Sequence, residues 1–522
     1  MVSVFSIFSL VVLYGGRSVS SLSIDASADV ASAARPEVQV EFDLDPESKA
    51  EWGGYAASRS DRPVLEGRST FPDGSPMGVN IRPIGGARKV ESVMTSTSTV
   101  LKAEGFNFGR GTAYITTEDV KQGSELFSLP MSKVMSVASA ARGRVGLLLE
   151  VNPDLPSSIA LGLHLLEEQA LGAKSNFSEF VATLPDIDDL NSTLFYSEDK
   201  LKEMEGSQLL RFTMGRVQAV QAFYDALLQP VTSREAVDPP IFKEEDFTLE
   251  KFRWAMGVVW ASAFPVGEIE EDMVLAPVLD TIGICTDIDE EGNESCPANR
   301  IEADQNTQRL IVFASVSYKQ GQEVHLSLPG KSSAQFMLNN GFARDRASQR
   351  LDKLDLTVTL DPSDPLAPMK GYLLQTQLNE SVNASYAFFH GSSKIDDEIS
   401  RSLKMKLLSG AELPRYKELL TTKEEENTEE GRQILSLRNE FVYTRAIMST
   451  CTTLLEQYPS PVDQDQHALD KLTDEGDLES ARKAHVKRIL IIEKQILKKT
   501  MDIALEDWKG LVFSSHPNLQ EV

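Results

Sequence analysis

The chain has 522 residues, enough for about three domains of roughly 150 residues each. Its 41% apolar and 25% charged residues are typical of a globular protein and exclude a wholly disordered or fibrous chain. Acidic residues outnumber basic ones by 78 to 52, and the net charge of −26 excludes a general nucleic-acid surface, because phosphate binding needs clustered Lys and Arg. The acidity either favours a basic protein or peptide partner or serves solubility alone.

The N-terminus begins with an apolar segment, VFSIFSLVVLY, from Val4 to Tyr14. These 11 residues are too few to span a bilayer as a helix, so residues 1–20 are predicted to be a signal peptide and no stable membrane span is expected after its cleavage. Residues 21–95 lack periodicity and predict a disordered leader or linker. The chain would then enter the secretory pathway and end secreted, lumenal, or in a plastid reached through a bipartite leader.

Five N-x-S/T sequons are compatible with passage through the endoplasmic reticulum: Asn176, Asn191, Asn293, Asn379 and Asn383. The three cysteines cannot form a disulfide framework, since at most one bridge is possible. Cys285 and Cys296 bracket an acidic stretch and could form that bridge in an oxidising compartment.

A metal site is another possible role for the acidic stretch. An EF-hand loop starting at Asp287 would place Ala298 at the twelfth position, where calcium needs a bidentate Glu. Zinc is excluded because the two cysteines have no CxxC or His partners nearby. We therefore expect no metal.

Order is predicted to begin near Val100. The segment GRGTAYITTEDVKQGSELFSLP, residues 109–130, predicts strands at Thr112–Thr117 and Glu125–Leu129, joined as a hairpin-like unit by a turn at 121–123. Gly109 and Gly111 would let the backbone approach a ligand closely, although such a pair also occurs in plain turns.

Helices follow. SSIALGLHLLEEQALG, from residue 157, predicts an amphipathic helix with its serines at a cap position, and the segments 209–228 and 247–264 predict two more. Aromatic residues in the last of these, Phe252, Trp254 and Trp260, are interpreted as core rather than as a binding platform.

Strands are predicted again at Arg309–Tyr318 and Glu323–Leu328. From Leu356 one strand, LTVTL, precedes helices over 434–458 and 481–508. The segments TKEEENTEEG and DQDQHALDKLTDEGD are predicted to be acidic loops.

This order of pieces resembles the SET-domain protein lysine methyltransferases of the Rubisco large-subunit methyltransferase type, from about Val100 to Phe513. The likeness rests on the GRGTAYITTEDVKQGSELFSLP strands, on the insert SSIALGLHLLEEQALGAKSNFSEFVATLPDIDDLNSTLFYSED, and on RNEFVYTRAIMSTCTTLLEQYPSPVDQD with ARKAHVKRILIIEKQIL. It implies an α+β fold. A β-rich SET domain would occupy 96–150 and 251–345 with a helical insert at 151–250, and an all-α substrate-binding domain would occupy 350–515.

The resemblance also implies S-adenosyl-L-methionine as cofactor, lying against the backbone of Gly109, Arg110 and Gly111. The family's Ser-Arg-x-Phe, whose Arg is thought to meet the cofactor carboxylate, corresponds here to ASAF with Ser262 in the Arg position. A hydroxyl cannot replace the charged, bidentate contact of a guanidinium.

The family's LVPxxDMxNH motif corresponds to LAPVLDTIGI, residues 275–284. Asp280 is retained, but Gly283 and Ile284 stand where the family has the Asn-His pair that helps to seat the cofactor. An amide and an imidazole are lost together.

The family's GEEVxIxYGxKSNxxxLxxYGF corresponds to GQEVHLSLPGKSSAQFMLNNGF, residues 321–342, with Leu328 and Asn340 in place of the two tyrosines. Methyl transfer to an amine needs a deprotonated, in-line nucleophile surrounded by oxygen atoms, which tyrosine hydroxyls supply and leucine does not. Rescue by Tyr318 or His325 is not expected, because strand alternation places His325 on the face opposite residue 328.

Two hypotheses follow. The first is a degenerate member of the family, a pseudoenzyme that binds a protein partner through its C-terminal helical domain with lost or reduced methyl transfer. The second is an active S-adenosylmethionine-dependent protein-lysine N-methyltransferase with rearranged site residues.

Overall fold

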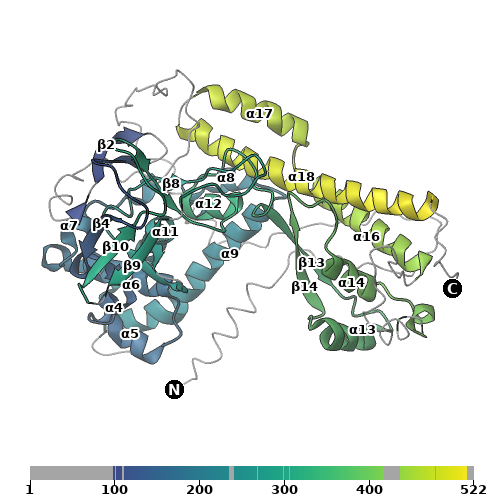
Figure 1. The fold of residues 1–522 in the computed structure, drawn as a ribbon. Coiled ribbons are helices and arrows are strands. Elements are labelled where there is room, and N and C mark those ends of the chain that lie inside the picture. Colours follow the sequence, from purple (N-terminus) through teal and green to yellow (C-terminus); the bar gives the residue numbers. More distant parts are fainter. Residues whose placement is uncertain are drawn as a thin grey trace.

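The protein is described by a computed structural model that covers residues 98–99, 101–107, 111–233, 240–266, 269–297, 299–304, 306–414, 416, 436–475 and 478–513 (Figure 1). The predicted signal peptide and the leader lie outside these residues, as do Gly109, Arg110 and the TKEEENTEEG segment. Within the described residues, helices and strands are present as the α+β prediction requires, and none of the helices is long and apolar enough to cross a membrane.

The β-rich part consists of short strands in several small sheets. One sheet has the order β1-β4-β10-β9 and a second the order β11-β3-β2, while β5-β7-β6 and the parallel pair β12-β8 complete the set. The strands are β1 (Ser98–Thr99), β2 (Leu101–Asn107), β3 (Gly111–Thr116), β4 (Glu125–Pro130), β5 (Met135–Ser136), β6 (Phe264–Val266), β7 (Ile269–Leu275), β8 (Ile284–Cys285), β9 (Arg300–Asp304), β10 (Arg309–Phe313), β11 (Glu323–Val324) and β12 (Leu326–Ser327).

The predicted hairpin between β3 and β4 is wrong. Its turn exists, with Gly123 at φ 81° and Ser124 N donating to Lys121 O at 3.0 Å. However, β3 pairs with β2 and β11, whereas β4 pairs with β1 and β10. The turn therefore passes the chain from one sheet to another.

A helical layer packs beside these sheets (Figure 1). Its central pair is α6 (Ser157–Leu171) against α11 (Leu249–Ser262). Phe252 and Trp254 are buried in this core and Trp260 packs against it, so their interpretation as core is confirmed. The other helices are α4 (Val137–Ala140), α5 (Val145–Val151), α7 (Ser178–Val181), α8 (Glu198–Lys202), α9 (Gln208–Phe223), α10 (Gln229–Thr232) and α12 (Ser333–Asn340).

Two details of this layer differ from the prediction. The residue that precedes α6 is Pro156, which makes no side-chain cap, so the serines lie inside the first turn. The helix predicted at 209–228 continues from α9 into a π-helical turn, Tyr224–Leu228, before α10.

The C-terminal part combines a two-stranded antiparallel sheet with helices. The sheet pairs β13 (Lys353–Thr359) with β14 (Asn383–Phe389), and β14 was missed by the prediction. The helices are α13 (Ala367–Leu373), α14 (Asp397–Lys406), α16 (Leu437–Glu456), α17 (Val462–Glu475) and α18 (Leu478–Phe513).

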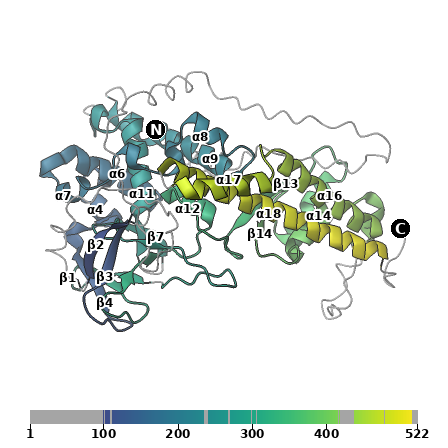
Figure 2. The ribbon, with the colours of Figure 1, turned by 90° about the horizontal axis from the view of Figure 1, so that it is seen from above.

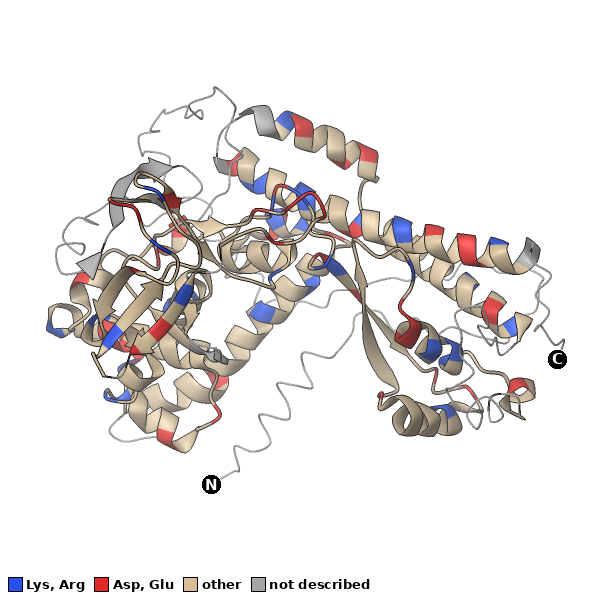
Figure 3. Cartoon of the chain, in the orientation of Figure 1, with Lys and Arg blue, Asp and Glu red and all other residues tan. Residues whose placement is uncertain are grey.

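The segment that was predicted to be an acidic loop after residue 462 is instead helix α17. Figure 3 shows both signs of charge along α17 and α18. Asp465 in the first turn of α17 is buried, and its carboxylate pairs with Lys494 and, at 2.9 Å, with Lys487 of α18. These long-range ion pairs hold α17 against α18. The local charge pattern of the sequence does not reveal them.

Helix α18 joins the two parts of the molecule, because it lies against α12 at one end and along α16 at the other (Figure 2). Arg482 of α18 donates from Nε to Asn191 Oδ1 of the helical layer at 2.8 Å. Ala343, just after α12, donates from its backbone N to His485 Nδ1 at 3.1 Å. Gly341 has φ 77°, and a side chain there would meet the backbone of Asn191.

Candidate functional site

The position of the family's Asn-His pair lies on the parallel pair β8–β12. Leu326 N donates to Gly283 O at 2.8 Å, and Ile284 lies opposite Leu326 in the register. Gly283 and Ile284 are both buried. The backbone at this position is thus used in strand pairing, and its only side chain is an apolar one.

The position of the first family tyrosine is also apolar. Burial alternates along the segment, with Val324, Leu326 and Leu328 buried while His325 is half-buried, as the alternation argument expected. Leu328 is 4% exposed and belongs to the same apolar cluster as Ile284. The places where the family carries an imidazole and a phenol are therefore joined here by hydrophobic packing.

The first part of the motif segment, Leu275 to Thr281, in which Leu275, Pro277 and Asp280 match the family's pattern, forms a tight turn. Ile282 N donates to Val278 O at 2.8 Å, and Val278 itself has φ 72°, a strained conformation for a β-branched residue. Thr281 Oγ1 is hydrogen-bonded to the hydroxyl of buried Tyr114 on β3 at 2.9 Å. Asp280 lies on the same turn and is half-buried. The turn geometry is present although the polar pair that follows it in the family is missing.

The remaining two substituted positions meet at the ends of two helices. Ser262 is the last residue of α11 and is buried. Asn340, the last residue of α12, donates from Nδ2 to Ala261 O at 2.7 Å, while its Oδ1 is buried without a hydrogen-bond partner. Neither side chain carries a charge that could pair with a carboxylate.

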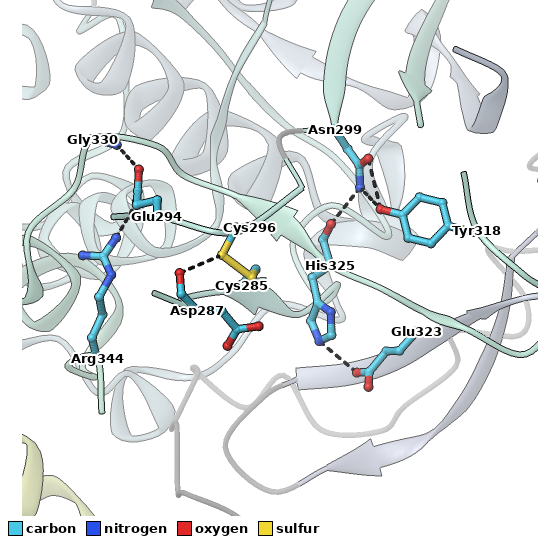
Figure 4. The surroundings of a disulfide bond; sticks show 10 residues. All are labelled: Cys285, Asp287, Glu294, Cys296, Asn299, Tyr318, Glu323, His325, Gly330 and Arg344. Atoms are coloured by element: carbon cyan, nitrogen blue, oxygen red, sulfur yellow. Dashed lines mark hydrogen bonds and ion pairs between the residues drawn. A yellow bond between two sulfur atoms is a disulfide. The ribbon is translucent and has the colours of Figure 1, made fainter. Parts of the chain in front are cut away.

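The two residues weighed as substitutes are engaged elsewhere (Figure 4). Asn299 Nδ2 donates to the Tyr318 hydroxyl at 3.0 Å and to His325 O at 2.9 Å. His325 Nε2 lies 3.1 Å from a carboxylate oxygen of Glu323. Burial raises the pKa of Tyr318, although the hydrogen bond to Asn299 opposes that shift. The Tyr318 phenol is thus held neutral within a local hydrogen-bond network.

Cys285 and Cys296 form a disulfide that closes the acidic stretch onto β8 (Figure 4). Glu294 in this loop pairs with the buried guanidinium of Arg344 and accepts a hydrogen bond from Gly330 N at 3.0 Å. Hydrogen bonds from Asn293 hold the pKa of Asp289 below its ordinary value. Among the described residues, no cluster of His, Cys, Asp or Glu is suited to a metal ion.

The structure thus separates the predicted site residues into two groups. Ile284 and Leu328 share one apolar cluster, and Gly283 lies beside them on the strand pair through its backbone O, whereas Ser262 and Asn340 lie at the α11–α12 contact. Gly111 begins β3, and Gly109 and Arg110 are outside the described residues. The sequence reasoning did not find Tyr114 and Asn299, whose partners lie up to 167 residues away in the chain.

S-adenosylmethionine carries a carboxylate, an ammonium and a sulfonium, so a site for it needs charged or hydrogen-bonding side chains. Ser262, Gly283 and Ile284 offer one hydroxyl among them. Among the described residues, Asn340 Oδ1 is a buried polar atom at these positions that has no hydrogen-bond partner. The side chains of Ser262, Gly283 and Ile284 do not supply the guanidinium, amide and imidazole that the resemblance leads one to expect, whereas Asp280 is present and Gly109 and Arg110 lie outside the described residues.

Comparison with known proteins agrees with the fold. A family model described as Rubisco LSMT substrate-binding matches residues 361–497. The SET domain of LSMT bound to lysine and AdoHcy superposes with a TM-score of 0.64 at 20% identity, covering 81% of this chain and 91% of that one. Rubisco LSMT bound to AdoMet gives 0.62 at 20% identity, with 81% and 90% covered. The chain therefore has an α+β fold of the SET-domain LSMT type, as predicted.

Curated relatives refine this class. The chain is 24% identical over 396 residues to the chloroplastic [fructose-bisphosphate aldolase]-lysine N-methyltransferase of Arabidopsis thaliana, covering 74% of this chain and 77% of the relative. It is 24% identical over 405 residues to the chloroplastic ribulose-1,5-bisphosphate carboxylase/oxygenase large subunit N-methyltransferase of Nicotiana tabacum, covering 76% of each. Human actin-histidine N-methyltransferase is 24% identical over 278 residues, 52% of this chain and 43% of the relative. The homologues are thus protein-lysine and protein-histidine N-methyltransferases, and the predicted resemblance is confirmed.

Proposed function

We propose that this protein is a SET-fold pseudoenzyme that binds a protein partner through its C-terminal helical domain and has lost or reduced methyl transfer. The observation that carries the proposal is the shared apolar packing of Ile284 and Leu328, in positions where the family has an imidazole and a phenol. Ser262 in place of the arginine supports the same conclusion.

The partner is a protein because the matched domain is a substrate-binding domain and the relatives' names give proteins as substrates. The net charge of −26 favours a partner with a basic surface. Two of these relatives are chloroplastic, which favours a plastid among the predicted destinations. The signal-peptide prediction can be checked by the localisation of a fluorescent fusion of residues 1–95.

The test is calorimetric titration of the purified chain with S-adenosylmethionine and with S-adenosylhomocysteine. The tobacco relative serves as the positive control in the same buffer. We expect saturable heat from the relative and none from this chain at micromolar concentration. Micromolar binding by this chain would contradict the loss of the cofactor site.

Turnover and partner binding need separate measurements. A labelled methyl donor incubated with Rubisco, aldolase or actin reports transfer, and we expect no label above that of boiled protein. Surface-immobilised chain titrated with the same three proteins reports binding, which should weaken with rising salt if basic surfaces are recognised. If none of the three proteins binds, they are rejected as partners, but this result gives no support to the enzymatic hypothesis.

An active S-adenosylmethionine-dependent protein-lysine N-methyltransferase with rearranged site residues is the second candidate. The buried and unpartnered Oδ1 of Asn340 favours it, since this atom could accept a hydrogen bond from a bound group. Labelled product that disappears in Asn340→Leu, with the fold retained, would decide for this candidate.

A further inference from the structure

The C-terminal part contains a cavity of about 510 Å³ between β13, α14 and α16, away from the positions discussed so far. Its volume falls in the range of about 300–1,000 Å³ that is typical of small-molecule sites. The lining is mostly apolar and includes Leu356, Val358, Phe388, Leu403, Leu407 and Ile447.

One cation in this lining, Lys406 on α14, has unusual surroundings. Its side chain is buried, and Nζ donates to Val358 O at 2.8 Å and lies 5.1 Å from the centre of the Tyr386 ring. No carboxylate of the described residues lies within ion-pair distance of this Nζ. Glu380, the carboxylate that influences it from further away, accepts hydrogen bonds from the hydroxyls of Tyr386 and Ser402.

The other buried lysines of the described chain have a carboxylate partner. Lys370 pairs with Asp364, and Lys494 pairs with Asp465. A buried charge without a counter-charge is costly, and burial accordingly lowers the pKa of Lys406 to about 8. Among the described residues, Lys406 is therefore the buried lysine that lacks a carboxylate partner, and a bound anion would supply the missing negative charge.

The other charges around the cavity restrict the ligand further. Arg438 already pairs with Glu412 at 3.2 Å, and Asp364 with Lys370. Asp361 also lines the cavity, and its carboxylate accepts a hydrogen bond from Ser363 N at 2.8 Å. Lys406 can balance one negative charge of a ligand, and the Asp361 carboxylate would repel a second one. The cavity therefore suits a ligand with a single negative charge rather than a dianion such as a phosphate ester.

We propose that this cavity binds a small amphipathic monocarboxylate of the fatty-acid type, with its apolar chain among the leucines and its carboxylate paired with the Lys406 ammonium. The chain would bury its methylene groups against the apolar lining. The headgroup would supply the counter-charge that Lys406 lacks within the protein. This site is independent of the cofactor positions, so it stands whether or not the protein transfers methyl groups.

The test is titration of the full chain with decanoate and with 1-decanol, both below their self-association limits, with stoichiometry checked by native mass spectrometry. We expect one saturable site that binds decanoate at least about 10-fold more tightly than decanol, a difference of about 1.4 kcal/mol. Equal affinity for both probes, or no saturable site, would overturn the proposal. Equal affinity would assign the cavity to an uncharged apolar group, such as a partner's side chain.

Three variants locate the binding. Lys406→Met should abolish the preference for decanoate while decanol binding is kept, and Lys406→Arg, the matched control, should retain the preference. Ala446→Phe, which adds a ring to the cavity wall, should weaken the binding of both decanoate and decanol by at least about 10-fold. Thermal melting verifies the fold of each variant. Decanoate binding that is unchanged in Lys406→Met or in Ala446→Phe would place the ligand elsewhere and overturn the proposal.

Discussion

Asn340 donates from its side-chain Nδ2 to the backbone carbonyl oxygen of Ala261 at 2.7 Å. This contact joins the last residue of α12 to the residue before Ser262 at the end of α11. The hydrogen bond thus ties Asn340 to the residue that precedes Ser262, so these two positions lie close together where the helices end. The amide stabilises the contact between the helices, a structural role that requires no cofactor.

The apolar character of the first tyrosine position can be measured with a matched pair of variants. Leu328→Tyr and Leu328→Phe differ only by a hydroxyl, and Leu328 is buried in an apolar cluster. We expect Leu328→Tyr to be less stable than Leu328→Phe by about 1–3 kcal/mol, because the hydroxyl would be buried without a partner. Chemical denaturation gives both free energies of unfolding. Equal stability of the pair would mean that a polar environment for a phenol still exists there.

Replacing the amide of Asn340 by a carboxylate should produce a pH-dependent loss of stability. In Asn340→Asp the ionised group would face the Ala261 carbonyl while buried, so its pKa should rise above the ordinary range. We expect the variant to be less stable than wild type by about 2 kcal/mol or more near pH 8 and to recover towards pH 5, where a protonated carboxyl can donate to the carbonyl. Asn340→Leu is the control and should show no such recovery. A stable aspartate at pH 8 would argue for solvent or a cation at this position.

Glu493 on α18 should make the stability depend on pH. Its carboxylate accepts a hydrogen bond from the Tyr458 hydroxyl at 2.9 Å, and burial raises its pKa to about 7. Because the folded state holds the proton more tightly than the unfolded state, the stabilisation is complete below the unfolded pKa of about 4.5 and is lost as pH rises through about 7. We expect wild type to lose about 2 kcal/mol relative to Glu493→Gln between about pH 5.5 and about pH 8.

The comparison with Glu493→Gln removes other titrations from the result. Burial lowers the pKa of His164 to about 4, so that residue makes the protein less stable as pH falls below about 6.5. This opposite effect is the same in both proteins and cancels in their difference. Parallel pH profiles for wild type and variant would show that Glu493 titrates normally.

Reduction of the disulfide should destabilise the protein. Cys285 and Cys296 lie 11 positions apart in the sequence, and closing a loop of that size contributes about 2–3 kcal/mol. We expect dithiothreitol to lower the melting temperature of wild type but not that of the Cys285→Ala, Cys296→Ala double variant. The third cysteine, Cys451, is free and buried, and should not contribute. If dithiothreitol leaves the melting temperature of wild type unchanged, the loop is held by its other contacts, such as the Glu294–Arg344 pair.

The sequence predicted the α+β class and most helices, because these depend on local periodicity. It failed where distant partners decide the structure. The segment of helix α17 was predicted to be an acidic loop, because its ion pairs from Asp465 to Lys487 and Lys494 of α18 are not visible in the local sequence. Strands β3 and β4 were predicted to pair with each other, whereas β3 pairs with β2 and β11, and β4 pairs with β10. At the candidate site the substituted residues could be read from a motif. Their neighbours Tyr114 and Asn299 could not, since contacts across many residues leave no local pattern.

The hydrogen bond between Arg482 and Asn191 has a consequence for maturation. Asn191 belongs to a glycosylation sequon, yet its side chain is 1% exposed and its Oδ1 accepts from the guanidinium of α18. A sugar on this nitrogen and the docked α18 exclude each other. If the chain does enter the endoplasmic reticulum, this sequon has to be left unmodified until α18, whose Arg482 is synthesised 291 residues later, has folded back over it. Any molecule glycosylated earlier at Asn191 would be unable to join its two halves.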